Sequence, residues 1–174
     1  TGANGGAVLV AAANEVLGGA GVDTLSFAGT GTTLNLRTVT DVGSATGFEV
    51  VNLTGTGNNT CTFGLDDLRD LTDGNAVART LRIDGNAGDV VNIAGAGVTG
   101  GTGAWVPTFN TPANGTSVTD VTGTAATAAT SAAGDSAAND VTIGANAYDV
   151  YQFASGNGLI TLLVDTDITK TFIA

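Results

Sequence analysis

The residues best suited to chemistry lie in one glycine- and aspartate-rich stretch, Gly18–Ser26, which reads Gly-Gly-Ala-Gly-Val-Asp-Thr-Leu-Ser. It is one complete copy of the nonapeptide G-G-x-G-x-D-x-U-x, where U is a large apolar residue. Glycines permit a tight turn with bare carbonyl oxygens, and an aspartate adds a charged oxygen, which are the donors that Ca²⁺ prefers. We therefore expect Asp23 to be the charged ligand of a Ca²⁺ site, with the carbonyls of Gly19 and Gly21 beside it.

One such turn does not complete a calcium site, because Ca²⁺ takes about 6–8 oxygen ligands. The nearest suppliers are Asn14 and Glu15 in the preceding turn, which lacks the glycines of a full repeat. The alternative is a structural turn in which the glycines serve only to reach positive φ. Both interpretations stay open for Gly18–Asp23.

A second candidate loop reads Asp-Gly-Asn-Ala-Gly-Asp, and its oxygen-bearing side chains are Asp84, Asn86 and Asp89. Three such side chains with two glycines have the composition of a loop that wraps a cation. Asp and Asn also favour turns by hydrogen bonding to nearby backbone, and this turn interpretation is the one we favour.

Composition excludes several classes of function. The net charge is -11, from 16 acidic and 5 basic residues, which disfavours nucleic acid and anionic membrane surfaces as partners and favours cations. No apolar run approaches the roughly 18 residues of a membrane-spanning helix, so we expect no membrane insertion. The absence of His and the single Cys disfavour zinc.

Enzymatic motifs are also missing. Without His no Ser-His-Asp triad forms, and the G-x-G-x-x-G match at 95–100 is followed by more glycine and by Pro107 instead of a helix. Acidic residues are numerous enough that a carboxylate pair of the glycosidase kind stays open as an alternative. Because the other catalytic motifs are missing, we expect no enzyme activity.

The elements that must position these residues are short strands. Runs of about four to six residues alternate apolar with polar side chains and are separated by Gly, Asn and Asp turns. This pattern predicts an all-β fold, a parallel β-solenoid or β-roll-like structure with irregular rungs. Tyr148–Phe153 and Leu159–Val164, joined through Gly156–Gly158, predict a C-terminal β-hairpin.

One segment has helical spacing. Leu65, Leu68 and Leu71 recur every three residues, and acidic residues in the first turn complement the helix dipole, which predicts one short helix over 65–71. The chain as a whole, 1–174, is expected to form a single domain. Its parts are a solenoid-like core over 1–95, a Gly/Ala/Thr-rich excursion over 96–140, and closing strands over 141–174.

The nonapeptide together with softer segments resembles the repeats-in-toxin (RTX) calcium-binding proteins. The closest likeness is to the C-terminal regions of large adhesins and cell-surface proteins exported by type I secretion. The softer segments are 47–60, 65–71, 81–93, 148–153 and 162–168. The resemblance implies secretion, extracellular calcium and a structural role.

We accordingly expect a structural, calcium-assisted extracellular module of a secreted bacterial surface protein, an adhesin or an S-layer-like protein. Its partners would be Ca²⁺ ions and either other copies of itself or cell-surface components. The first alternative is a self-assembling subunit of an extracellular filament or surface layer, because exposed strand edges invite pairing. The second is a carbohydrate-binding or carbohydrate-cleaving β-helix domain, although only 5% of residues are aromatic.

Overall fold

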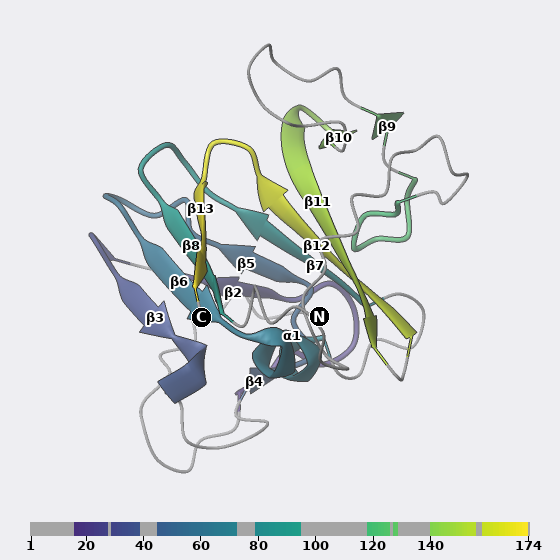
Figure 1. The fold of residues 1–174 in the computed structure, drawn as a ribbon, viewed down its shortest axis with the longest axis horizontal. Coiled ribbons are helices and arrows are strands. Elements are labelled where there is room, and N and C mark those ends of the chain that lie inside the picture. The colour runs from purple at the N-terminus through teal and green to yellow at the C-terminus, as the bar shows by residue number, and fades with distance from the viewer. Residues whose placement is uncertain are drawn as a thin grey trace.

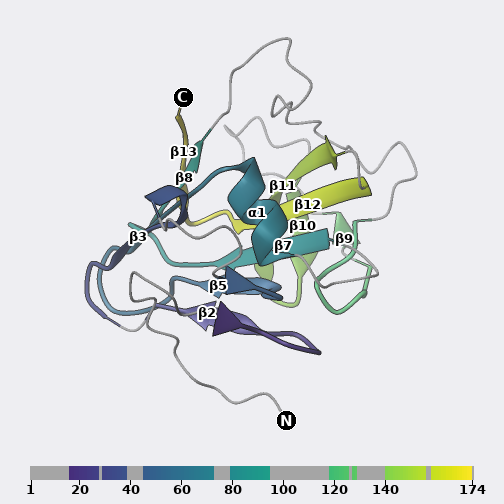
Figure 2. The same cartoon turned by 90° about the horizontal axis from the view of Figure 1, so that it is seen from below.

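The computed structural model describes residues 16–27, 29–38, 45–72, 79–94, 118–125, 127–128, 140–155 and 158–173. Two large sheets enclose the main core, and a short helix lies at one end of the space between them (Figure 1; Figure 2). A small two-stranded sheet accompanies them.

The larger sheet has seven strands. Their order is β2 (Thr24–Ser26), β5 (Val50–Asn52), β7 (Arg79–Asp84), β12 (Gly158–Asp165), β11 (Asn146–Ser155), β10 (Asp140–Ile143) and β9 (Thr127–Ala128). The four-stranded sheet has the order β13 (Thr169–Ile173), β8 (Val90–Ala94), β6 (Thr60–Phe63) and β3 (Thr33–Asn35). The two-stranded sheet pairs β1 (Val16–Leu17) with β4 (Ala45–Thr46).

The chain alternates between the two large sheets. Strands β2, β5, β7 and β12 pair in parallel in the larger sheet, and each is followed along the chain by a strand of the smaller sheet, β3, β6, β8 or β13. Those four are also parallel to one another. The turns between the sheets therefore stack on one another, which is how residues about thirty positions apart come into contact.

The prediction of an all-β parallel solenoid is wrong. The seven-stranded sheet is mixed, because β11, β10 and β9 continue it through antiparallel pairs, and a helix joins the two sheets in a mixed α/β-like fold. The physical reason is that period-2 alternation marks a half-buried strand but does not specify the direction of its neighbour. The predicted C-terminal hairpin is present as β11 and β12, whose connecting residues 156–157 lie outside the described residues.

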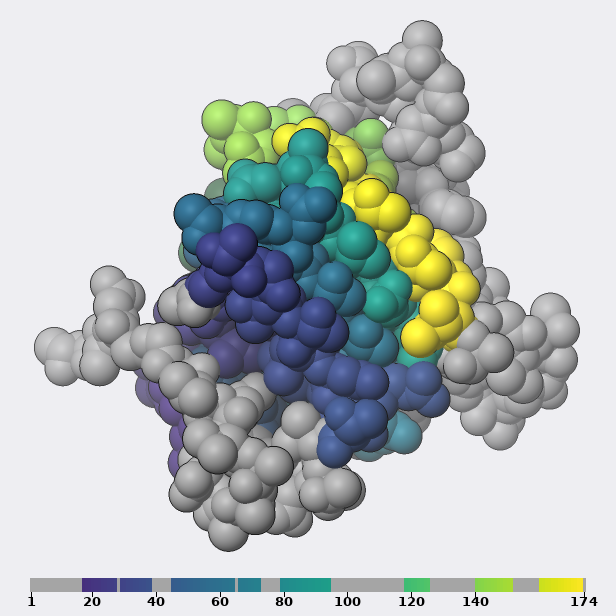
Figure 3. Space-filling model, turned by 90° about the vertical axis from the view of Figure 1, so that its left-hand side faces the viewer, coloured from purple at the N-terminus to yellow at the C-terminus, as the bar shows by residue number. Residues whose placement is uncertain are grey.

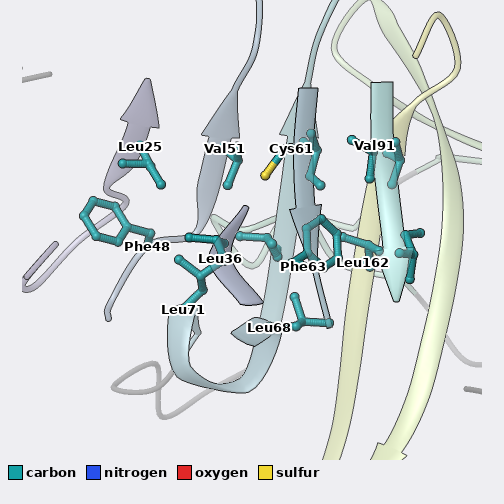
Figure 4. Close-up of a cluster of buried hydrophobic side chains, with 14 of the residues drawn as sticks. Leu25, Leu36, Phe48, Val51, Cys61, Phe63, Leu68, Leu71, Val91 and Leu162 are labelled. Atoms are coloured by element: carbon teal, nitrogen blue, oxygen red, sulfur yellow. The ribbon is translucent and has the colours of Figure 1, made fainter. Parts of the chain in front are cut away.

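The helix expected over 65–71 is present as α1 (Leu65–Leu71). It begins after Gly64, whose N–H donates to the Asp67 carboxylate at 2.7 Å, and the acidic first turn complements the helix dipole. Leu68 and Leu71 are buried against the core, as Figure 4 shows. A short 3₁₀ turn, η1 (Leu36–Thr38), adds buried Leu36 to the same cluster.

The main core lies between the sheets and draws on both. Leu25, Val51 and Leu162 come from the larger sheet, and Cys61 and Val91 from the smaller (Figure 4). Burial raises the pKa of the Cys61 thiol to about 12, so it packs as a small apolar side chain.

A second cluster covers the other face of the seven-stranded sheet. It contains Val118, Val141, Tyr148, Val150 and Leu163. Val118 belongs to the segment expected to be an excursion over 96–140, and its burial shows that the described part of this segment packs onto the sheet. Residues 95–117 and 129–139 lie outside the described residues.

Candidate metal centre at the first turn

The glycine-rich turn at 18–23 stacks on a second turn, Gly47–Glu49. Parallel pairing of β1 with β4 before the turns and of β2 with β5 after them holds the two in register. The backbones touch, since the Gly18 N–H donates to the Thr46 carbonyl at 2.9 Å and a Cβ on Gly18 would lie 1.8 Å from the Gly47 carbonyl oxygen. Glycine is therefore required at Gly18 by close approach, whereas Gly19 and Gly21 have φ of 103° and 118°.

The two turns bring the carboxylates of Asp23 and Glu49 together. The Asp23 N–H donates to Glu49 Oε2 at 2.8 Å, and the Asp23 carbonyl accepts the N–H groups of Glu49 and Val50 at 3.2 and 3.1 Å. Glu49 is only 3% exposed. Burial raises the pKa of Glu49, the hydrogen bond from the Asp23 backbone lowers it, and the nearby Asp23 charge raises it again. The net direction is upward, as expected for a buried acid beside a second one.

One oxygen at this place has no hydrogen-bond partner. Asp23 Oδ2 is buried and makes no hydrogen bond. Within the described residues, no salt bridge joins a lysine or arginine to Asp23 or Glu49. Glu49 is buried and Asp23 is half-buried with its Oδ2 atom buried, and neither carboxylate has a cationic partner among the described residues. Two such carboxylates on stacked glycine-containing turns form a donor set that suits a hard divalent cation such as Ca²⁺.

The ligand set differs from the one that the sequence indicated. Asn14 and Glu15, expected to complete the site, lie outside the described residues. Across the ranges that the structure describes, no group of three or more His, Cys, Asp or Glu side chains converges. The first turn therefore supplies two carboxylates, and carbonyl and water oxygens would have to complete the coordination of an ion.

Glu49 is the residue that sequence reasoning missed. It lies 26 residues after Asp23, in the next turn of the stack, whereas Asn14 and Glu15 belong to the turn that precedes Asp23 in the sequence. The sequence does carry a signal for Glu49, because both Asp23 and Glu49 stand immediately before a strand. Those two strands pair through Thr24 and Val50.

The second predicted loop has its oxygens engaged by protein groups. The buried Asp89 carboxylate accepts the backbone N–H of Asn59 through Oδ1 at 2.8 Å and that of Asn86 through Oδ2 at 2.7 Å. The Asn86 side chain is exposed. Asp84 forms a two-point salt bridge with Arg82 at 3.0 and 3.1 Å and accepts the Tyr148 hydroxyl at 2.8 Å. These contacts are those of a structural turn, the interpretation that the sequence favoured.

Charged side chains also meet on the outer face of the larger sheet. Arg82 contacts Asp120 at 3.2 Å in addition to Asp84, which ties the 118–125 segment to β7. Burial, followed by the hydrogen bond to the Asp84 carboxylate, raises the pKa of Tyr148 to about 12. Both acids in this network have a cationic partner, so it is a structural network.

Among the described residues, no helix has the length and apolarity needed to cross a membrane. The chain was compared with protein-family models, curated proteins and solved structures, and no match was found in any of the three.

Proposed function

We propose that this chain is a structural module of a secreted surface protein whose folded state is stabilised by calcium at the first turn. The observation that carries the proposal is the pair formed by buried Glu49 and half-buried Asp23, whose buried Oδ2 lacks a hydrogen-bond partner. A Ca²⁺ ion on these carboxylates would supply the missing partner and neutralise two like charges. The nonapeptide motif that places Asp23 is itself a calcium-binding signature.

Calcium would act by linkage to folding. The two carboxylates belong to turns about 26 residues apart, which only the folded chain brings together. An ion that binds only the folded state stabilises it by about 2.7 kcal/mol at a concentration 100 times its Kd. With a net charge of -11, the chain would be less stable where calcium is scarce, as in a cytosol, and more stable outside the cell.

Thermal unfolding followed by circular dichroism tests this proposal. We expect the wild-type melting temperature to rise between excess chelator and millimolar Ca²⁺, and to rise less in Mg²⁺, which demands tighter octahedral geometry. Asp23→Asn and Glu49→Gln should each remove the calcium response. The matched control is Asp66→Asn in the exposed first turn of α1, which should respond as wild type does. Equal melting temperatures of the wild type in chelator and in calcium would refute the calcium role.

A second candidate function is self-assembly into a filament or layer. Figure 3 looks onto the four-stranded sheet, which runs from β3 to β13, and both are edge strands. On β13 the residue Phe172 is 47% exposed, and a large apolar side chain at an open edge favours association. Light scattering after size exclusion, with Phe172→Thr as the comparison, tests this candidate. A particle mass that increases with concentration for the wild type but not for Phe172→Thr supports it. A wild type that is monomeric at all concentrations argues against it.

A further inference from the structure

The only lysine in the sequence, Lys170, points into the protein. It lies on the edge strand β13 and is in register with Val91 of β8, whose side chain is part of the main core. Its ammonium group contacts the carboxylate of Asp149 on β11, and the two side chains are only 15% and 16% exposed. A second contact repeats two residues further along both strands, where the Phe172 ring meets the Tyr151 ring edge to face at 5.7 Å. The two contacts fix β13 against β11 of the other sheet.

A second carboxylic acid adjoins this pair. Asp140 on β10 lies directly opposite Asp149 in the antiparallel register, so the two side chains share a face, with Cβ atoms about 4.5–5.5 Å apart. Asp140 is also buried. Like charges directly opposite one another destabilise a strand pair, and here the single ammonium of Lys170 lies against the same face. An amine, a carboxyl and a second carboxyl therefore meet where water is largely excluded.

We propose that Lys170 and Asp149 condense into an intramolecular isopeptide bond. Transfer of a proton from the ammonium to the Asp149 carboxylate turns the ion pair into a neutral amine and a neutral acid. The lone pair of Nζ then attacks Cγ of Asp149. Asp140 accepts the proton that the nitrogen loses and returns it to the departing hydroxyl group. One C–N bond forms, one C–O bond breaks and one water leaves, with no oxidant or cofactor required.

Position and burial are what favour this reaction. Holding a nucleophile against its target corresponds to effective concentrations of about 10⁵ M or more, so a reaction that is slow between free molecules becomes feasible within a fold. Exclusion of water strengthens the electrostatic effect of Asp140 and disfavours the reverse hydrolysis. The product would covalently join the four-stranded sheet to the seven-stranded sheet through the edge strand β13.

Intact-mass spectrometry of the purified chain tests the proposal without any variant. The expected mass is lower than that of the sequence by one water molecule. Trypsin should fail to cut after Lys170 and leave residues 83–174 as one peptide that carries the whole mass deficit. An amine-reactive label should not modify Lys170 even after denaturation. The full sequence mass with cleavage after Lys170 would show an ion pair only and overturn the proposal.

Variants locate the bond. Lys170→Arg preserves the ion pair but not the chemistry, and Asp149→Ala removes the acceptor, so each should have its full calculated mass. Asp140→Asn should lower the cross-linked fraction at least tenfold while the far-ultraviolet dichroism stays that of wild type, which separates proton transfer from a purely structural role. A one-water deficit that persists in Lys170→Arg, or that fragmentation assigns to another residue, would also overturn the proposal.

Discussion

Two turns of this molecule share a hydrogen-bonding plan and differ in one group. At the first turn, the Asp23 N–H donates to the carboxylate of Glu49 in the next turn at 2.8 Å. At the opposite turn, the Asn59 N–H donates to the carboxylate of Asp89 in the next turn, also at 2.8 Å. All four residues come immediately before strands that pair in parallel, β2 with β5 and β6 with β8.

The difference is an amide in place of an acid. The Asn59 side chain accepts the Thr32 N–H at 2.9 Å through Oδ1 and donates to the Leu53 carbonyl at 2.9 Å through Nδ2. Asp23 occupies the equivalent place with a carboxylate, which has no proton to donate, and its Oδ2 is left without a partner. In stacked turns, a neutral amide next to an acid can donate and accept hydrogen bonds and so continue the hydrogen-bond network. An acid next to an acid leaves a negative charge that a bound cation could neutralise.

The largest effect should come from removing the satisfied carboxylate. Asp89→Ala leaves the buried N–H of Asn59 and the partly buried N–H of Asn86 without acceptors, and should cost about 3 kcal/mol or more of unfolding free energy. Urea denaturation measures this loss. Asp66→Ala, on an exposed salt bridge, is the control and should change stability by less than about 0.5 kcal/mol. Comparable losses in the two variants would refute the structural role of Asp89.

The next largest effect should come from giving the Asn59–Asp89 turn the acid-over-acid arrangement of the first turn. Asn59→Asp places a carboxylate beside Asp89 and removes the bond from Nδ2 to the Leu53 carbonyl. We expect a loss of roughly 2 kcal/mol at neutral pH, because the buried carbonyl loses its donor and two like charges meet. Urea denaturation at pH 7 checks this, and wild-type stability would contradict the role assigned to the amide.

The reciprocal change, Asp23→Asn, should stabilise the first turn when no calcium is present. It replaces one of two neighbouring carboxylates by a neutral amide, so in excess chelator the variant should be more stable than wild type by about 1 kcal/mol. Millimolar Ca²⁺ should reverse the order of the two proteins. Melting temperatures in both conditions measure the crossover. A variant less stable than wild type in chelator would show that the Asp23 carboxylate stabilises the turn by itself.

The smallest effect should be a dependence on pH through Glu49. The folded-state pKa of Glu49 lies above its ordinary value of 4.5, chiefly through burial, so the folded state holds this proton more tightly than the unfolded state. The contribution of Glu49 is therefore present below pH 4.5 and is lost as pH rises through its folded pKa. In chelator, the stability of wild type relative to Glu49→Gln should therefore fall as pH rises through the folded-state pKa of Glu49. A difference that grows in favour of wild type with rising pH would contradict it.

Local patterns made part of this fold predictable. The spacing of Leu65, Leu68 and Leu71 indicated α1, and the glycine turn between the alternating segment 148–153 and the nearly continuous apolar run 159–164 indicated the hairpin of β11 and β12. Outside that hairpin, strand direction was not predictable, because alternation records which side chains are buried and is the same for parallel and antiparallel neighbours. The mixed seven-stranded sheet follows from that hairpin, which adds β11 antiparallel to β12.

The candidate site was predictable to the same extent. The nonapeptide identified Asp23 and its glycines, because those requirements are local. Glu49 was missed because its relation to Asp23 depends on the parallel register of β2 and β5. Asp89 had the composition of a ligand, but its two oxygens accept backbone N–H groups, and one of these comes from 30 residues away. An acidic residue therefore indicates a metal site only once the partners of its oxygens are known.

Isothermal calorimetry of calcium binding tests the central claim most directly. Titration of the chelator-treated wild type with Ca²⁺ should show a binding event, and Asp23→Asn should abolish it while Asp66→Asn retains it. No binding heat with the wild type at several temperatures, or unchanged affinity in Asp23→Asn, would contradict the assignment of calcium to the first turn.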